Sequence, residues 1–145
     1  MQADIAVIDY GMGNLRSVSK AIEHVAPAAR VVVTSDPDII AAAGRVVFPG
    51  QGAAPDCMRE IDARGLRDVI IAAAQSKPFL GICMGMQILF EHSEEGDTDC
   101  LGILPGTVQR FPSEAMQDEA GAKLKVPHMG WNNVHQAAPH PLWSG

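Results

Sequence analysis

One stretch, Lys77 to Phe90, constrains the fold more than any other part of the chain, and it reads KPFLGICMGMQILF. An apolar run leads into Cys83, and a helix-like segment follows at once. Glycines stand two residues before and two residues after the cysteine, at Gly81 and Gly85. A buried strand that turns directly into a helix strains the turn residue and leaves little room for side chains two positions away. The pattern is therefore that of a nucleophile elbow with cysteine as the nucleophile.

A catalytic role is not the only interpretation of Cys83. A cysteine among apolar residues is more often a small buried hydrophobe than a nucleophile. The flanking glycines and the switch from strand to helix favour the nucleophile, because a helix N-terminus offers free N–H groups and a dipole that stabilise a thiolate. We therefore expect Cys83 to be alkylated more readily than Cys57 or Cys100.

Apolar strands alternate with amphipathic helices along the first part of the chain. Strands are predicted at residues 4–9, 30–34, 46–48 and 78–82, and helices at 14–25, 37–43, 55–63, 66–75 and 84–90. This alternation predicts an α/β fold in which helices flank a doubly wound, mostly parallel sheet. Antiparallel strands are expected after residue 100, within 101–111 and at 123–126. The length of 145 residues predicts a single domain over residues 1–145.

Composition and charge exclude several classes of protein. A net charge of -6 without a cluster of Lys and Arg argues against a nucleic-acid partner. The longest strongly apolar run, Val69 to Ala74, is far too short to span a membrane, and the N-terminus lacks the basic start of a secretory signal. Three widely spaced cysteines fit neither a disulfide framework nor a zinc site and favour a reducing cytoplasm. We expect no cofactor and no metal, and we interpret the acidic run from Glu91 to Asp97 as a solvated surface.

A glycine-rich loop, Tyr10 to Asn14, joins the first predicted strand to the first predicted helix, whose expected N-cap is Asn14. Its two glycines suggest a dinucleotide-binding fingerprint, but Arg16 stands where the third glycine is needed. The loop is therefore either a tight turn or a surface that faces a ligand or partner, as loops at the carboxyl ends of such strands usually do.

A thiolate that attacks an amide needs oxyanion donors, a base and a group that orients the base. Two sets of donors are available, the backbone N–H of Met84 and the loop Gly50-Gln51-Gly52, although that loop pattern alone is equally a plain turn. No base is evident, because no histidine stands in a His-x-Glu or His-x-Asp frame. Each histidine is therefore interpreted as surface or local structure: His24, His92, His128, His135 and His140.

The motif from Gly81 to Gln87 resembles the nucleophile motif of class I, or triad-type, glutamine amidotransferases. Three further segments narrow the resemblance: Asp9 to Leu15, the Pro49-Gly50 loop and Pro127 to Asn132. Together they are similar to the glutaminase subunits of imidazole glycerol phosphate synthases, which belong to histidine biosynthesis. The resemblance runs along essentially the whole chain.

This resemblance implies a glutaminase in which Cys83 attacks the side-chain amide of glutamine and forms a glutamyl thioester that water hydrolyses. Gln87 and Glu95 would bind the substrate, and a carboxylate such as Glu95 suits the α-ammonium of glutamine. The oxyanion hole would be formed by Gly50, Gln51, Gly52 and Met84. The partner would be a cyclase subunit with a (βα)8 barrel, which receives the ammonia. The residues expected to face this partner are Asn14, His128, Met129, Trp131 and Asn132.

Two departures from the family pattern qualify these expectations. Gln51 stands where the family usually has valine, in the loop whose peptide orientation is thought to gate activity. Family members also continue past the position of Gly145 with a segment that carries the catalytic histidine and glutamate. We therefore expect a truncated, incomplete domain with negligible glutaminase activity. Two alternatives stay open: a silent subunit that only docks on the cyclase, and another cysteine-elbow enzyme such as a dienelactone-type hydrolase.

Overall fold

The computed structural model describes residues 3–112, 116–117, 121–125 and 130–143. The chain divides into two compact units, Met1–Arg110 and Phe111–Gly145. The first unit contains the α/β fold and the candidate nucleophile. The single domain expected over residues 1–145 stays a prediction.

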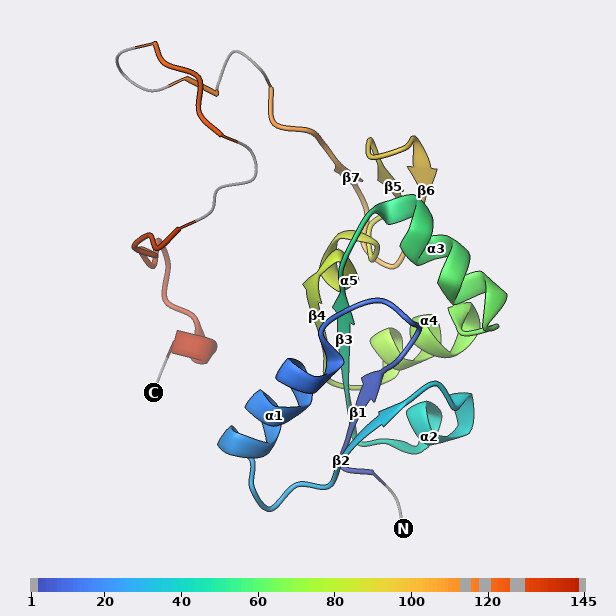
Figure 1. The fold of residues 1–145 in the computed structure, drawn as a ribbon. Helices are drawn as coiled ribbons and strands as arrows, with labels where there is room; N and C mark the ends of the chain where they lie inside the picture. Colours follow the sequence, from blue (N-terminus) through green and yellow to red (C-terminus); the bar gives the residue numbers. More distant parts are fainter. Residues whose placement is uncertain (1–2, 113–115, 118–120, 126–129, 144–145) are drawn as a thin grey trace. The chain divides into compact units, whose positions relative to one another are not determined.

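The first unit is built on a sheet of four parallel strands in the order β2-β1-β3-β4 (Figure 1). Its strands are β1 (Ile5–Ile8), β2 (Val31–Thr34), β3 (Arg45–Gly50) and β4 (Phe79–Cys83). β1 is buried along its whole length between two neighbours, which explains its continuous apolar sequence. The chain adds β2 on one side of β1 and β3 on the other, so the prediction of a doubly wound parallel sheet is confirmed.

Helices cover both faces of this sheet (Figure 1). They are α1 (Leu15–Val25), α2 (Pro37–Ala42), α3 (Ala54–Ala63), α4 (Arg67–Ser76) and the single turn α5 (Met84–Gln87). α1 covers one face, where its apolar side chains pack against Ile5, Val7 and Val47. The main core lies on the opposite face, around Ile8 and Phe48, under α3 and α4. None of the helices that the structure describes has the length and apolar character needed to cross a membrane.

Polar side chains define several helix ends. Asn14 Oδ1 accepts the backbone N–H of Ser17 at 3.2 Å, so the predicted N-cap of α1 is confirmed, and Asp36 caps α2 by accepting the N–H of Asp38. The ammonium of Lys77, directly after α4, donates to two carbonyl oxygens at the end of α2 at 2.6 and 2.9 Å. This positive charge sits where the partial negative charge of the α2 dipole is concentrated.

A second, smaller sheet follows α5 in the order β6-β5-β7. Its strands are β5 (His92–Ser93), β6 (Thr98–Asp99) and β7 (Thr107–Val108). β5 pairs antiparallel with β6 but parallel with β7. The strand within 101–111 was expected to be antiparallel to its neighbour, and this prediction is wrong for β7. The reason is the connection before β7, in which the N–H groups of Leu101 and Ile103 bond back to the carbonyls of Ile88 and Leu89. The chain thereby reverses once more before it reaches β5.

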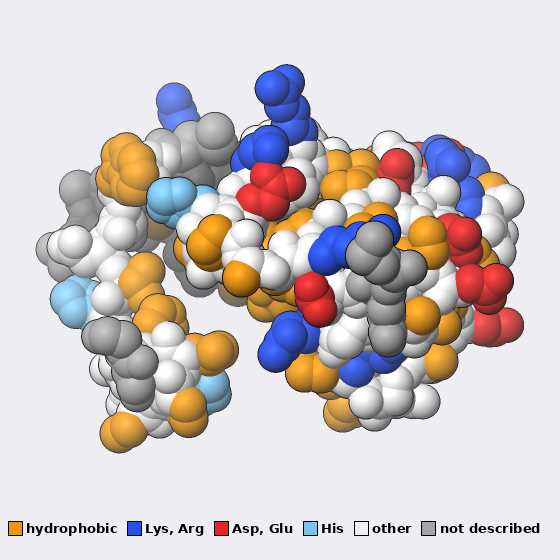
Figure 2. Space-filling view, turned by 90° about the horizontal axis from the view of Figure 1, so that it is seen from below, with side chains coloured by type: hydrophobic (Ala, Val, Ile, Leu, Met, Phe, Trp, Pro, Cys, Tyr) orange, Lys and Arg blue, Asp and Glu red, His pale blue; other side chains and the backbone are white. Residues whose placement is uncertain are grey.

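The described residues of the second unit hold little regular structure. Gln117 and Lys123 form an antiparallel bridge, and a turn of 3-10 helix spans Pro141–Trp143. The bridge contains the first residue of the strand expected at 123–126, whereas residue 126 lies outside the described residues. Large apolar side chains are exposed in this unit: Trp131, Val134, Leu142 and Trp143. Figure 2 shows hydrophobic side chains lying open on the molecular surface.

Candidate active site

Cys83 is the last residue of β4 and lies immediately before α5, with an exposed side chain. Its backbone angles are φ 56° and ψ −119°, a region that residues with a Cβ rarely adopt. The predicted strained elbow is therefore confirmed. The chain makes this turn because β4 is held in the parallel sheet up to Cys83 while the next residue already begins a helical turn.

The flanking glycines are required by close backbone contacts. A Cβ on Gly81 would lie 2.8 Å from the carbonyl oxygen of Gly85, and a Cβ on Gly85 would overlap the carbonyl oxygen of Phe48. Both obstacles are backbone atoms, which cannot rotate away as a side chain can. The structure thus confirms that glycines are needed two residues before and after Cys83 because side chains there would collide with the backbone.

The helix that follows the nucleophile is shorter than predicted. α5 ends at Gln87 instead of continuing to Phe90, because the chain turns at Ile88 and Leu89 to bury both side chains in the core. A single helical turn has a much smaller macrodipole than a full helix. Access therefore distinguishes Cys83 better than the dipole does: Cys57 and Cys100 are buried, and burial raises the pKa of both of their thiols.

The sheet register brings the proposed oxyanion loop to the nucleophile. Gly50 of β3 is paired directly with Cys83 of β4. A Cβ on Gly50 would collide with the backbone nitrogen of Gly85 and would lie 2.8 Å from Met84 Cβ. Gln51 and Gly52 follow without interruption, and both are exposed. The structure thus places Gly50 and Met84 beside Cys83, with Gln51 and Gly52 next along the chain after Gly50, while the catalytic role of all four residues stays a prediction.

The two predicted substrate residues, Gln87 and Glu95, belong to different elements. Gln87 ends α5 and is half-buried. Glu95 belongs to the hairpin between β5 and β6, and its Oε2 accepts the backbone N–H of Ala54 at 2.9 Å. Ala54 is the first residue of α3, whose N-cap, Ala53, has no side chain able to cap it. A carboxylate from a segment 41 residues away therefore serves as the cap of α3.

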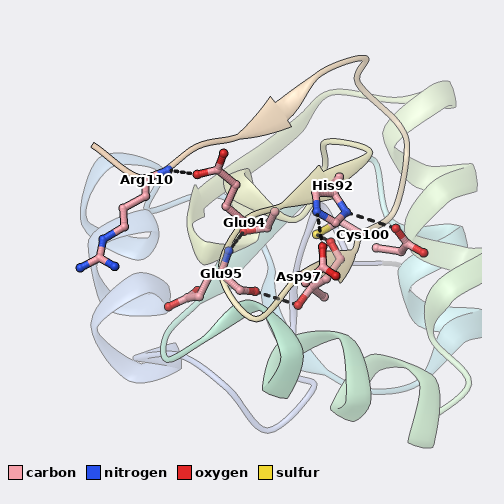
Figure 3. A network of polar contacts seen from close by, with 9 residues as sticks. His92, Glu94, Glu95, Asp97, Cys100 and Arg110 are labelled. Carbon is pink, nitrogen blue, oxygen red and sulfur yellow. Dashed lines mark hydrogen bonds and ion pairs between the residues drawn. The ribbon is translucent and has the colours of Figure 1, made fainter. Parts of the chain in front are cut away.

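The acidic run is more than the solvated surface that was expected. Glu91 Oε2 accepts the N–H of Gly106 at 3.0 Å. Glu94 Oε2 accepts the N–H of Arg110 at 2.7 Å (Figure 3). Each of these carboxylates therefore ties the small sheet to a neighbouring segment of backbone. Charge-assisted bonds of this kind are stronger than bonds between neutral groups, so the run is a structural element.

The described histidines are local structure, in agreement with the interpretation of the sequence. His92 Nε2 lies 3.2 Å from Asp97 and its Nδ1 lies 3.2 Å from Asp99, within the same hairpin (Figure 3). His24 and His135 are exposed, and His140 accepts a backbone N–H two residues away. Among the residues that the structure describes, no histidine is hydrogen-bonded to Cys83.

The expected partner surface is only partly described. Asn14 is exposed and also caps α1. Trp131 and Asn132 are exposed in the second unit, and His128 and Met129 lie outside the described residues. Within the described part of the chain, no group of three or more His, Cys, Asp or Glu side chains is arranged to hold a metal ion.

Sequence reasoning missed two residues beneath the oxyanion loop, Tyr10 and Cys57. Both are fully buried, and the Tyr10 hydroxyl lies 3.7 Å from Cys57 Sγ. Cys57 Sγ in turn lies 3.5 Å from the carbonyl oxygen of Gln51. The sequence contains no signal that predicts the contact between Tyr10 and Cys57, because 47 residues separate the two side chains.

Comparison with known proteins agrees with this geometry. Residues 6–145 match the family model described as Glutamine amidotransferase class-I. The imidazole glycerol phosphate synthase subunit HisH of Thiobacillus denitrificans is 84% identical over 145 residues, which make up 100% of this chain and 64% of that protein. The subunit of the same name from Aromatoleum aromaticum is 70% identical over 143 residues, or 99% of this chain and 68% of that protein.

A solved structure described as a crystal structure of glutamine amidotransferase has the same fold, with a TM-score of 0.61 at 17% sequence identity. That likeness covers 74% of this chain and 56% of the other. Compared with the Thiobacillus relative, the present chain spans 64% of the length of that protein. With a family match over residues 6–145 and a nucleophile elbow at Cys83, the chain belongs to the class-I glutamine amidotransferases.

Proposed function

We propose that this chain is the nucleophile-bearing part of a glutaminase subunit of imidazole glycerol phosphate synthase. The observation that carries the proposal is the exposed Cys83, held at positive φ and paired in register with Gly50. The names of the HisH relatives support the choice of this synthase among glutamine amidotransferases. Free thiols at all three cysteines are in keeping with a reducing compartment, for which we propose the cytoplasm.

The proposed reaction begins when the Cys83 thiolate attacks the side-chain amide carbon of glutamine. A C–S bond forms, and the negative charge on the amide oxygen faces the N–H groups of Met84 and of the Gly50–Gly52 loop. The C–N bond then breaks, the nitrogen takes up the proton that the Cys83 thiol lost on forming the thiolate and leaves as ammonia, and a glutamyl thioester remains. Water hydrolyses this thioester to glutamate and regenerates the thiol.

Substrate binding is assigned to Gln87 and Glu95. Glu95 uses Oε2 to cap α3, which leaves Oε1 for the α-ammonium of glutamine. The side-chain amide of Gln87 can both donate and accept, which suits the polar groups of an amino acid. The Glu95 carboxylate would thus bind the substrate and cap α3 at the same time.

The partner in this proposal is a cyclase subunit with a (βα)8 barrel, which forms a heterodimer with the glutaminase. Ammonia would pass through the barrel to a phosphoribulosyl-formimino aminoimidazole carboxamide ribonucleotide. The residues proposed to face this partner are Asn14, His128, Met129, Trp131 and Asn132.

A second candidate function is docking on the cyclase without hydrolysis. The state of the described histidines favours it, because His92 is engaged with Asp97 and Asp99 and none is bonded to Cys83. Within the described part of the chain no histidine is placed to act as its base, and a nucleophile without a base cannot be activated efficiently. We therefore expect the 145-residue chain with the cyclase subunit to release no more ammonia from glutamine than its Cys83→Ala variant does.

The experiment separates substrate binding from turnover. Ammonia release is measured with cyclase and its nucleotide ligand, with the Thiobacillus relative as the positive control. In parallel, iodoacetamide labelling of Cys83 is followed by mass spectrometry with and without glutamine. Protection of Cys83 by glutamine, lost in Glu95→Ala, would support the substrate site, whereas turnover at the rate of the relative would contradict the expected lack of a base.

A further inference from the structure

Cys57 holds a position under the candidate site that the proposed reaction does not use. It lies in the first turn of α3, is fully buried, and is one of three free thiols in the chain. Its Sγ stands between two oxygen atoms, the Tyr10 hydroxyl at 3.7 Å and the Gln51 carbonyl at 3.5 Å. The Gln51 carbonyl belongs to the loop that follows Gly50, the residue paired with Cys83.

The direction of these two hydrogen bonds follows from the available protons. A carbonyl oxygen can only accept, so the thiol must donate to Gln51. The sulfur is then free to accept from the Tyr10 hydroxyl, which donates to it. Burial raises the pKa of Tyr10 and also that of Cys57, so both groups keep their protons at neutral pH. The result is a directed chain from Tyr10 through Cys57 to the loop.

This chain constrains the loop because a peptide unit is planar and trans. In a trans peptide the carbonyl and the N–H point in opposite directions. Anchoring the Gln51 carbonyl on a buried thiol therefore directs the N–H of Gly52 away from the core. Gly52 itself has φ +95°, a conformation that glycine adopts without strain.

We propose that Cys57 is a positioning residue that sets the orientation of the Gln51–Gly52 peptide in the oxyanion loop. The oxyanion role of this loop rests on the proposed function, whereas the orientation of the peptide does not. Glu95 holds the other end of the same loop through the N–H of Ala54. The loop is thus anchored at its carbonyl by Cys57 and at the start of α3 by Glu95.

The test compares Cys57→Ser, which keeps a donor of similar size, with Cys57→Ala, which has none. Cys100 provides the matched control, because it is also buried and its Sγ lies 3.5 Å from the carbonyl of Thr98, outside this loop. Carbon-13 and nitrogen-15 labelled chains are examined by NMR. The readouts are the carbonyl shift of Gln51, the nitrogen shift of Gly52, and exchange with a second peptide orientation.

In Cys57→Ala we expect the carbon-13 chemical shift of the Gln51 carbonyl to move from the value of a hydrogen-bonded carbonyl to that of a carbonyl without this bond. We expect the population of the other orientation to rise by about two- to twelvefold, the ratio that corresponds to one lost hydrogen bond. Cys57→Ser should restore the native shifts, and Cys100→Ala should leave both resonances in place. Should the alanine variant fail to fold, Cys57→Val supplies a side chain without a donor and without a large cavity.

Unchanged Gln51 and Gly52 resonances in the donor-free variant would overturn the positioning role. Equal changes in the serine and alanine variants would overturn it as well, since a purely structural effect needs no donor. A wild-type chain that neither binds nor hydrolyses glutamine would refute the proposed function and leave the NMR result intact.

Discussion

Replacing Cys83 with glycine should leave the chain more stable than replacing it with alanine. Both substitutions remove the thiol from an exposed position, so neither loses much packing. They differ in the Cβ atom, which alanine retains at φ 56° and ψ −119°. The comparison therefore isolates the backbone strain stored at the elbow.

The size of the effect follows from two opposing contributions. A residue with a Cβ in a sparsely populated backbone region costs about 1–3 kcal/mol. Glycine avoids that cost but loses about 0.5–1 kcal/mol through its greater freedom in the unfolded chain. Cys83→Gly should thus exceed Cys83→Ala in unfolding free energy by up to about 2.5 kcal/mol. For a chain of this size, each kcal/mol corresponds to about 2–4 °C in Tm.

Thermal and urea unfolding followed by circular dichroism would measure this difference. Leu80 provides the control, because it lies in the same strand, is 56% exposed and has no positive φ. At Leu80 the order should reverse, with glycine less stable than alanine by about 0.5–1 kcal/mol. If Cys83→Gly is no more stable than Cys83→Ala, the elbow stores no strain and the reasoning fails.

Three further predictions concern the thiols, a helix end and an ion pair. A limiting dose of iodoacetamide should label Cys83 at least tenfold faster than either buried cysteine, as read by mass spectrometry. Lys77→Met should lower the unfolding free energy by about 0.3–1 kcal/mol, because it removes the charge at the end of α2. Hydrogen bonds from Arg67 hold the pKa of Asp62 below its ordinary value, so this pair stabilises the fold above about pH 4. That contribution to the unfolding free energy is lost as the pH falls through the folded pKa of Asp62. Asp62→Asn should therefore reduce the loss of unfolding free energy at acid pH, by less than about 1 kcal/mol.

Each of these predictions has an outcome that would contradict it, and the Lys77 prediction also has a matched control variant. Equal labelling of all three thiols in the native chain would contradict the accessible elbow. Lys20→Met serves as the control for Lys77→Met, since Lys20 is an exposed α1 residue paired with Glu23 on its own helix. An equal loss of stability in both methionine variants would remove the special role of Lys77. A stability curve for Asp62→Asn that parallels the wild-type curve below pH 4 would contradict the ion pair.

Local features of the structure were predictable from neighbouring residues. Asn14 caps α1 as expected, and the glycines around Cys83 are required by the backbone contacts that their spacing indicates. The alternation of apolar strands and amphipathic helices correctly predicted the parallel sheet. These features depend on sterics and periodicity within about ten residues, which a sequence displays directly.

Other features were out of reach because their partners lie far away along the chain. The α5 helix was predicted to reach Phe90, but burial of Ile88 and Leu89 in the core ends it at Gln87. The strand within 101–111 pairs parallel to β5 because the preceding connection bonds back to the residues after α5. In both cases tertiary packing outweighed the local pattern.

From its sequence alone, the chain specifies a nucleophile elbow at Cys83, since glycine spacing and a strand-to-helix switch leave few other solutions. Only the tertiary structure decides what surrounds that cysteine. The register of β3 against β4 places Gly50 opposite it, and Glu95 and Cys57 reach the adjoining loop from distant or buried positions. The physical reason is that a hydrogen bond or a strand pair depends on distance in space, and a sequence records only order along the chain.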